Sequence, residues 1–132
     1  KMVQLEENTS AYIQYSYARI SNIIRNSGVT INRNNINRFS FQFVKSTERD
    51  LALQLLQFED AIRQSVEEYY PSILASYLYA VAKQFSTFFD QCPVIKAESE
   101  ELRNGRLALC FVAGRTLEMG LNLLGISAVP RM

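Results

Sequence analysis

Catalytic chemistry has few candidate side chains in this sequence, because histidine is absent from all 132 residues. Histidine is the commonest general base and the commonest partner that activates a serine or cysteine nucleophile. Its absence excludes serine-histidine and cysteine-histidine catalysis. The adjacent carboxylates Glu67-Glu68 and Glu100-Glu101 would point in different directions on a helix, so they do not converge on one substrate. The glycines match neither GxGxxG nor a phosphate-binding loop with its lysine. We therefore expect a chain that binds rather than catalyses.

Metal binding is also disfavoured by the cysteines. Cys92 and Cys110 are the only two in the chain, and they form no CxxC pair. Structural zinc sites take several closely spaced cysteine or histidine ligands. The sequence therefore predicts no metal site and two buried free thiols.

One group of residues near the start of the chain could bind a ligand. At about 100° per residue, two tyrosines, an arginine and three asparagines fall on one side of a helix, opposite its apolar residues. They are Asn8, Tyr12, Tyr15, Arg19, Asn22 and Asn26. Tyrosine rings can stack on unpaired bases and arginine can bind phosphate, which favours single-stranded RNA as the partner. An equal alternative has Tyr12 and Tyr15 pack beneath the loop that follows the helix.

The charges are distributed in three blocks along the chain. Residues 8–47 carry five basic side chains and no acid, and residues 48–101 carry ten acids against four basic residues. Residues 102–132 carry four arginines against a single glutamate. If the two basic blocks meet in space, the fold presents a positive face of the kind that binds polyanions. The alternative is that each block is simply a solvated surface.

Hydrophobic spacing predicts that these residues are carried by long helices. The predicted helices cover residues 10–26, 46–70 with a break near Glu59-Asp60, 71–92 and 99–125, of which the last is the longest. Asn8-Thr9-Ser10, Ser46-Thr47-Glu48 and Ser99 supply the expected starts of three of them. Residues 29–45 are predicted to form an asparagine-rich loop that ends in a short extended piece.

The last helix contains three glycines, Gly105, Gly114 and Gly120. Each costs about 1 kcal/mol relative to alanine, so close approach of a neighbouring helix should compensate. No apolar stretch reaches the roughly 20 residues that a membrane-spanning helix needs. We predict an all-α antiparallel bundle of four to five helices, forming a single domain over residues 1–132.

Five segments spread over nearly the whole chain share one pattern. The first is NTSAYIQYSYARI, and the others are LLQFEDAI, PSILASYLYAVAKQFSTFFDQCPV, ELRNGRLALCFVAGRTLEMGLNLLGI and the tail Pro130-Arg131-Met132. Together they resemble the C-terminal anticodon-binding (DALR-type) domain of arginyl-tRNA synthetases. The chain departs from the usual pattern of that family at Ala11, Glu59, Ser72 and Phe89, and in the tail sequence AVPRM. Phe89, which replaces a tyrosine, can still stack on a base.

The resemblance implies a helical domain that binds the anticodon stem-loop of tRNA-Arg within a cytoplasmic enzyme. The implied tRNA-binding residues are Tyr12, Tyr15, Arg19, Asn22, Phe89, Arg131 and Met132. The class I catalytic signatures HIGH and KMSKS are absent, and the chain opens unusually with Lys1-Met2-Val3. We therefore expect a C-terminal piece of an enzyme that joins arginine to its tRNA with ATP. The nucleotide would bind in a catalytic domain outside this chain, which itself is expected to hold no cofactor.

Two alternatives to this interpretation remain at the level of sequence. A related helical domain from a cysteinyl- or methionyl-tRNA synthetase would share the bundle, although the tail argues against it. A helical protein-interaction module would use the tyrosine face to contact a partner protein. Such binding would be far less sensitive to salt than RNA binding.

Overall fold

A computed structural model of the protein describes residues 2–130, with side chains from Asn8 onward. Within these residues the chain forms helices and no strand. The elements are α1 (Met2–Ser27), α2 (Ser46–Leu55), α3 (Phe58–Glu67), α4 (Pro71–Gln91) and α5 (Glu100–Leu123), with a short 3-10 helix η1 (Ile36–Arg38) between α1 and α2. None of the described helices is long and apolar enough to cross a membrane. The predicted all-α bundle is confirmed.

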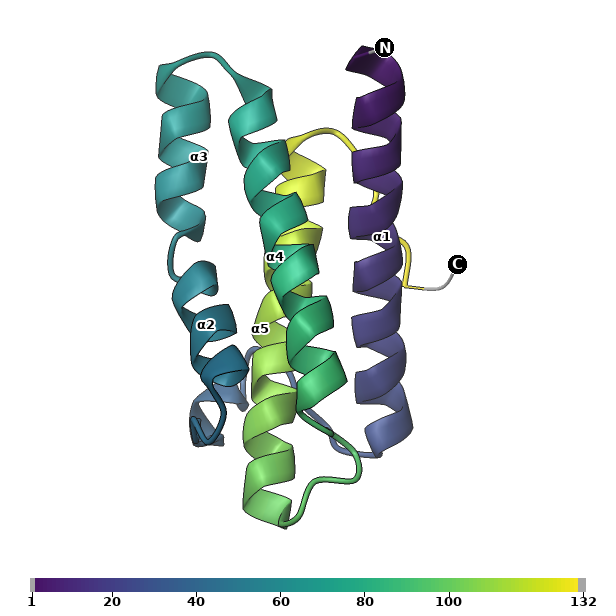
Figure 1. Ribbon diagram of the computed structural model, residues 1–132, viewed down its shortest axis with the longest axis vertical. Helices are drawn as coiled ribbons and strands as arrows, with labels where there is room; N and C mark the ends of the chain where they lie inside the picture. The colour runs from purple at the N-terminus through teal and green to yellow at the C-terminus, as the bar shows by residue number, and fades with distance from the viewer. Residues whose placement is uncertain (1, 131–132) are drawn as a thin grey trace.

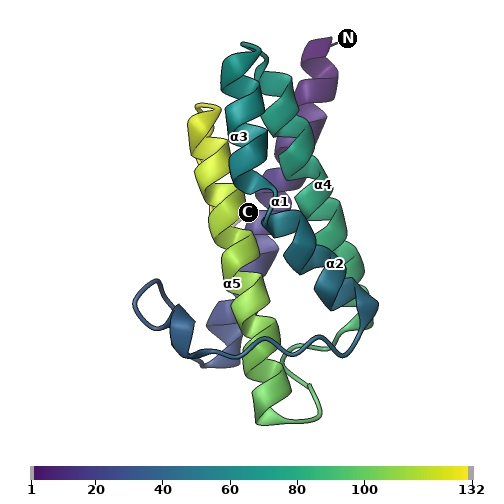
Figure 2. The ribbon, with the colours of Figure 1, turned by 90° about the vertical axis from the view of Figure 1, so that its left-hand side faces the viewer.

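The helices pack side by side around α4 and α5. Figure 1 shows α1 on one side of α4 and the α2-α3 pair on the other, with α5 behind them. α5 and α3 run antiparallel to α4, whereas α1 runs parallel to it. Figure 2 shows the loop between α1 and α2 crossing the first half of α5. Because α1 contacts both α4 and α5, side chains of its two flanks face two different surfaces of the bundle.

The start of α1 and the break between α2 and α3 differ from the predictions. α1 begins at Met2, so Asn8-Thr9-Ser10 lie inside the helix and do not cap it. With 26 residues against 24, α1 rather than α5 is the longest element. The break predicted near Glu59-Asp60 lies instead at Leu56-Gln57, and the two acids occupy the first turn of α3. Carboxylates stabilise that position through the positive end of the helix dipole.

The loop between α1 and α2 forms no strand, although Phe39 and Lys45, in its last part, have extended backbone. The alternation of Phe39, Phe41 and Phe43 produces instead a pair of stacked, exposed rings at Phe41 and Phe43, with centroids 6.3 Å apart. The loop passes over Gly105, where a Cβ atom would lie only 2.7 Å from the carbonyl oxygen of Ser40. The loop is therefore held closely against α5.

The core consists mainly of the apolar stripes of α4 and α5. Its buried stripe residues are Leu74, Leu78, Val81, Phe85, Phe88 and Cys92 on or directly after α4, and Leu107, Cys110, Gly114, Leu117 and Leu121 on α5. The helical spacing of apolar residues within 46–70 runs on to Val66 and Tyr69, which predicts that they are buried. This prediction is wrong, because their side chains are 67% and 91% exposed. α3 stops at Glu67, and Tyr69 adopts a left-handed φ of 53° in the turn to α4.

Two of the three helical glycines allow the predicted close approach of helices. A Cβ atom at Gly114 would lie 3.0 Å from Ile20 of α1, and one at Gly120 would lie 2.5 Å from Leu78 of α4. Gly105 faces the loop backbone and no helix, so the prediction is wrong for this residue. Glycine thus brings both α1 and α4 close to α5.

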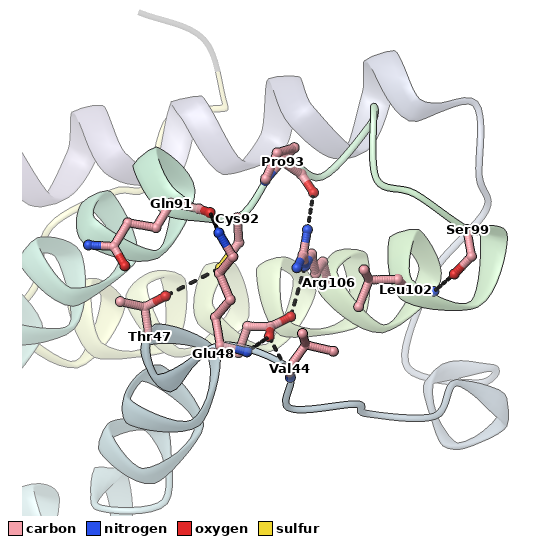
Figure 3. A network of polar contacts seen from close by, with 10 residues as sticks. Val44, Thr47, Glu48, Gln91, Cys92, Pro93, Ser99, Leu102 and Arg106 are labelled. Atoms are coloured by element: carbon pink, nitrogen blue, oxygen red, sulfur yellow. Dashed lines mark hydrogen bonds and ion pairs between the residues drawn. The ribbon is translucent and has the colours of Figure 1, made fainter.

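A buried ion pair fixes the start of α2 to α5 (Figure 3). Arg106 Nε lies 2.8 Å from Glu48 Oε2, with side chains 4% and 0% exposed. The other oxygen of Glu48 accepts hydrogen bonds from the backbone amides of Val44 and Lys45. Arg106 Nη1 also donates to the carbonyl of Pro93 at 2.6 Å. Both charges are thus satisfied internally, as buried ions require.

Candidate nucleic-acid interface

The outer face predicted for the first helix is present on α1. Tyr15 is 51% exposed and Asn22 is exposed, while Tyr12 and Arg19 are partly buried. The opposite side of the helix, which carries Ile13 and Ile20, lies in the core. The spacing of three and four residues therefore places all four predicted side chains along one side of α1.

Arg19 links this side of α1 to the end of α4. Its guanidinium lies over the ring of Phe89 at 5.1 Å from the centroid, and at 5.8 Å from the centroids of both Tyr15 and Phe85. Phe85 and Phe89 stack in turn with centroids 6.0 Å apart. Aromatic faces attract a cation, so these rings orient the guanidinium. The structure thus brings together three of the predicted site residues, Tyr15, Arg19 and Phe89.

Two residues of α4 extend this surface and were missed from the sequence. Tyr79 packs against Tyr12 with ring centroids 5.3 Å apart, and Lys83 Nζ lies 5.9 Å from the centroid of Tyr79. Tyr79 and Lys83 are exposed and one helical turn apart, beside the buried stripe of α4. The sequence signal that could have identified them is an aromatic and a basic residue four positions apart on the exposed side of the predicted helix. We call Tyr12, Tyr15, Arg19, Tyr79, Lys83 and Phe89 the α1-α4 seam.

The charges of the α1-α4 seam are available to a ligand. Among residues 8–130, neither Arg19 nor Lys83 forms an ion pair with a carboxylate. Their positive groups instead lie against aromatic rings. A surface with two cations and half-exposed tyrosine rings can bind phosphates and stack on bases. No group of acidic residues or cysteines suited to a metal ion occurs in the described part of the chain.

The C-terminal tail lies on another flank of α1. Gln14 Nε2 donates a hydrogen bond to the carbonyl of Ser127 at 3.0 Å, and Pro130 reaches a hollow beside α5. Figure 1 shows the tail passing behind α1. The two remaining predicted site residues, Arg131 and Met132, lie outside the described residues. The tail therefore runs beside α1 as far as Pro130.

The second basic block contributes less positive surface than its composition suggests. Arg106, which the charge count places in this block, is buried against Glu48 and adds no charge to the surface. Arg103 and Arg115 lie 3.7 and 3.4 Å from the carboxylates of Glu100 and Glu118. All three arginines of α5 are thus paired with acids. The unpaired cations of the seam come from α1 and α4.

Comparison with known proteins identifies the family. The model of the DALR anticodon binding domain matches residues 13–132. The chain is 40% identical over 131 residues to the arginine-tRNA ligase of Klebsiella pneumoniae strain 342, covering 99% of this chain and 22% of that relative. It is 39% identical over 131 residues to the arginine-tRNA ligase of Pasteurella multocida, covering 99% of this chain and 23% of the relative.

Solved structures agree with these relatives. The arginyl-tRNA synthetase of Thermus thermophilus superposes with a TM-score of 0.81 at 36% identity, over 92% of this chain and 21% of that one. The arginyl-tRNA synthetase of Plasmodium falciparum gives a TM-score of 0.75 at 28% identity, over 92% of this chain and 21% of that one. The chain thus spans about a fifth of the proteins it matches, and these favour the arginyl over the cysteinyl or methionyl alternative. The chain belongs to the DALR anticodon binding domain family, in the form found in arginine-tRNA ligases.

Proposed function

We propose that this chain binds the anticodon stem-loop of tRNA-Arg and that the α1-α4 seam contacts its unpaired bases. The observation that carries the proposal is the half-exposed ring of Tyr15 beside Arg19, whose guanidinium is oriented by Phe89. Tyr15 offers a flat face for a base, while Arg19 and Lys83 offer charge to the neighbouring phosphates. Asn22 adds an exposed amide at the end of the same side of α1.

We further infer that the chain works as one part of an enzyme that joins arginine to tRNA-Arg with ATP. Relatives that bear the name arginine-tRNA ligase are between four and five times as long as the matching segment, which covers 22% of their length. In this proposal the catalytic signatures and the ATP site belong to the remainder of a longer cytoplasmic protein. The chain contributes recognition, with Arg131 and Met132 of the tail as additional contacts to the anticodon loop.

Substitution of Tyr15 tests the proposal. Tyr15→Ala should weaken binding of the tRNA-Arg anticodon stem-loop by about 1–3 kcal/mol, which is the usual contribution of one base-aromatic stack. Because half of this ring is already exposed, the melting temperature should change little. Fluorescence anisotropy of a labelled stem-loop measures the affinity, and circular dichroism measures the melting temperature. Tyr70→Ala, an exposed tyrosine before α4, is the matched control and should leave the affinity unchanged.

Two results would contradict the proposed function. One is a wild-type chain that does not bind the stem-loop at low salt. The other is equal affinity of wild type and Tyr15→Ala, which would mean that the Tyr15 ring does not contact the RNA. Binding of the stem-loop that is insensitive to salt would show that Arg19 and Lys83 do not contact phosphates, since neutralising phosphates gives a strong salt dependence.

A further inference from the structure

A hollow of about 830 Å³ lies on the opposite flank of α1 from the α1-α4 seam. It lies between α1, α5 and the start of the loop that follows α1. Its apolar lining includes Tyr17 and Ile20 of α1, Phe111 and Gly114 of α5, and Pro130 of the tail. We call this hollow the α1-α5 groove. None of its lining residues belongs to the seam.

Three arginines line the α1-α5 groove. Arg25, Arg33 and Arg115 line it, from α1, the loop and α5 respectively. The only carboxylate among its lining residues is Glu118, which lies 3.4 Å from Arg115. Two guanidinium groups thus remain in excess over acids. Guanidinium forks match the geometry of phosphate oxygens, so the groove is complementary to a phosphate-bearing ligand.

The loop that carries Arg33 is held in place by its own asparagines. Asn32 Oδ1 accepts hydrogen bonds from the backbone amides of Asn34 and Asn35, at 2.9 and 3.1 Å. Asn35 Oδ1 accepts one from the amide of Asn32 at 2.8 Å. These bonds form a compact turn around Arg33. A cation on a fixed turn loses less entropy on binding than one on a free chain.

The groove and the seam are connected across the exposed side of α1. Arg25 lines the groove, and its Nη2 donates a hydrogen bond to Oδ1 of Asn22. Asn22 lies on the same side of α1 as Tyr15 and Arg19. A ligand that contacts the seam can therefore continue over the last turns of α1 into the groove without leaving polar surface.

We propose that the α1-α5 groove binds the sugar-phosphate backbone of the same RNA whose unpaired bases contact the seam. This inference rests on the proposed function. Arg25 and Arg33 contact backbone phosphates, and the amides of Asn32 and Asn34 line the same path. Since none of these groups faces a base-stacking ring of the seam, the groove adds affinity through charge, whereas the seam adds it through stacking.

The test measures affinity for the tRNA-Arg anticodon stem-loop over a series of salt concentrations. Arg33→Gln and Arg25→Gln should each weaken binding severalfold and flatten the plot of log affinity against log salt by about 0.7, the value for one lost single-strand phosphate contact. Arg63→Gln is the control of equal charge, because Arg63 is 61% exposed on α3 beside Asp60. It should leave both the affinity and the slope unchanged.

A second measurement locates the contacts. Methylphosphonate groups, which carry no charge, replace single phosphates of the stem-loop one at a time. At the phosphate that Arg33 contacts, the neutral group should weaken binding of the wild type but not of Arg33→Gln. Such non-additivity identifies a direct partner. Additive effects at every phosphate would overturn the assignment.

The inference and the proposed function fail in different ways. If Tyr15→Ala weakens binding while Arg25→Gln and Arg33→Gln match the wild type in affinity and salt slope, the groove proposal is wrong and the seam proposal stands. If the wild type does not bind the stem-loop, both are wrong. Unchanged melting temperatures of the arginine variants show that any loss reflects contacts rather than folding.

Discussion

Cys110 is a thiol that the fold isolates from solvent. It is fully buried in α5, and burial raises its pKa from the ordinary 9.0 to about 12. Cys92 is also buried, with its Sγ 3.3 Å from Oγ1 of Thr47. Because both sulfur atoms are buried, neither cysteine is accessible for redox chemistry in the folded chain.

The raised pKa of Cys110 predicts a loss of stability in alkali. The unfolded thiol ionises near pH 9, while the folded one stays neutral until about pH 12. The free energy of unfolding should therefore be constant with respect to this group below pH 9 and fall as the pH rises from there. Urea unfolding at pH 8.0, 9.0 and ~9.8 measures the change. This window precedes most ionisation of Tyr77, whose pKa is also raised by burial from 10.0.

The matched variant is Cys110→Ala, which should show a flatter dependence on pH whatever its absolute stability. Native thiols should react with a thiol reagent only at the rate of unfolding. Rapid labelling of both cysteines without denaturant would contradict their burial.

Residue-level prediction succeeded where partners are close in sequence. The positions of Tyr12, Tyr15, Arg19 and Asn22 follow from a rotation of about 100° per residue. Their neighbours Tyr79 and Lys83 lie on a helix far along the chain, so no local pattern pairs them with α1. The same applies to the ion pair of Glu48 with Arg106, which depends on tertiary packing.

At the scale of elements, the contact between the α1-α2 loop and α5 requires glycine at position 105, where there is no side chain. Alanine at Gly105 would favour the helix by about 1 kcal/mol on propensity alone. Its Cβ, however, would lie 2.7 Å from the backbone oxygen of Ser40, which is not a flexible end of a side chain. Gly105→Ala should therefore destabilise the fold by about 1–3 kcal/mol, as overpacking usually does.

Chemical denaturation of wild type and Gly105→Ala measures this difference in the free energy of unfolding. Its sign shows whether the loop contact or helix propensity has the larger effect. An increase in stability of about 1 kcal/mol would mean that helix propensity dominates and that the loop yields at no cost. Asn104→Ala, one residue away on the same helix, is the control for helix propensity.

Helix boundaries were less predictable than helix faces. Asn8-Thr9-Ser10 are good N-cap residues, yet they lie within α1, because cap preference is weak compared with continued helix formation. Ser99 does cap α5, accepting a hydrogen bond from the amide of Leu102. Serine therefore lies inside a helix at Ser10 and caps one at Ser99, depending on whether the preceding residues are helical.

At the scale of the whole molecule, one core joins helices that are distant in sequence. Buried residues of α1, α2, α3, α4 and α5 belong to a single cluster, in which α3 contributes Ala61, with its partly buried Phe58 and Ile62 packed against the cluster. The chain should therefore unfold in one cooperative transition, with an enthalpy of roughly 90 kcal/mol from the usual value per residue. Far-ultraviolet circular dichroism and tyrosine absorbance should give the same midpoint. Two separate midpoints would mean that α2 and α3 melt independently.

Charge counting along the sequence predicts the molecule's surface only in part. The acid-free block does supply the free cation of α1 and two arginines of the groove. Arg106, counted in the second basic block, is buried, because a carboxylate from the acidic block reaches it. Composition cannot distinguish a charge on the surface from one inside an ion pair.

The parallel packing of α1 with α4 has a consequence for biosynthesis. α1 leaves the ribosome before either helix that covers its apolar side, and roughly 100 residues follow before α5 is complete, which takes about 5–20 s at ordinary rates of synthesis. Until α4 and α5 have been synthesised, Ile13 and Ile20 lack their native partners on those helices. Among the helices of this domain, α1 is therefore expected to be the first that chaperones of nascent chains recognise.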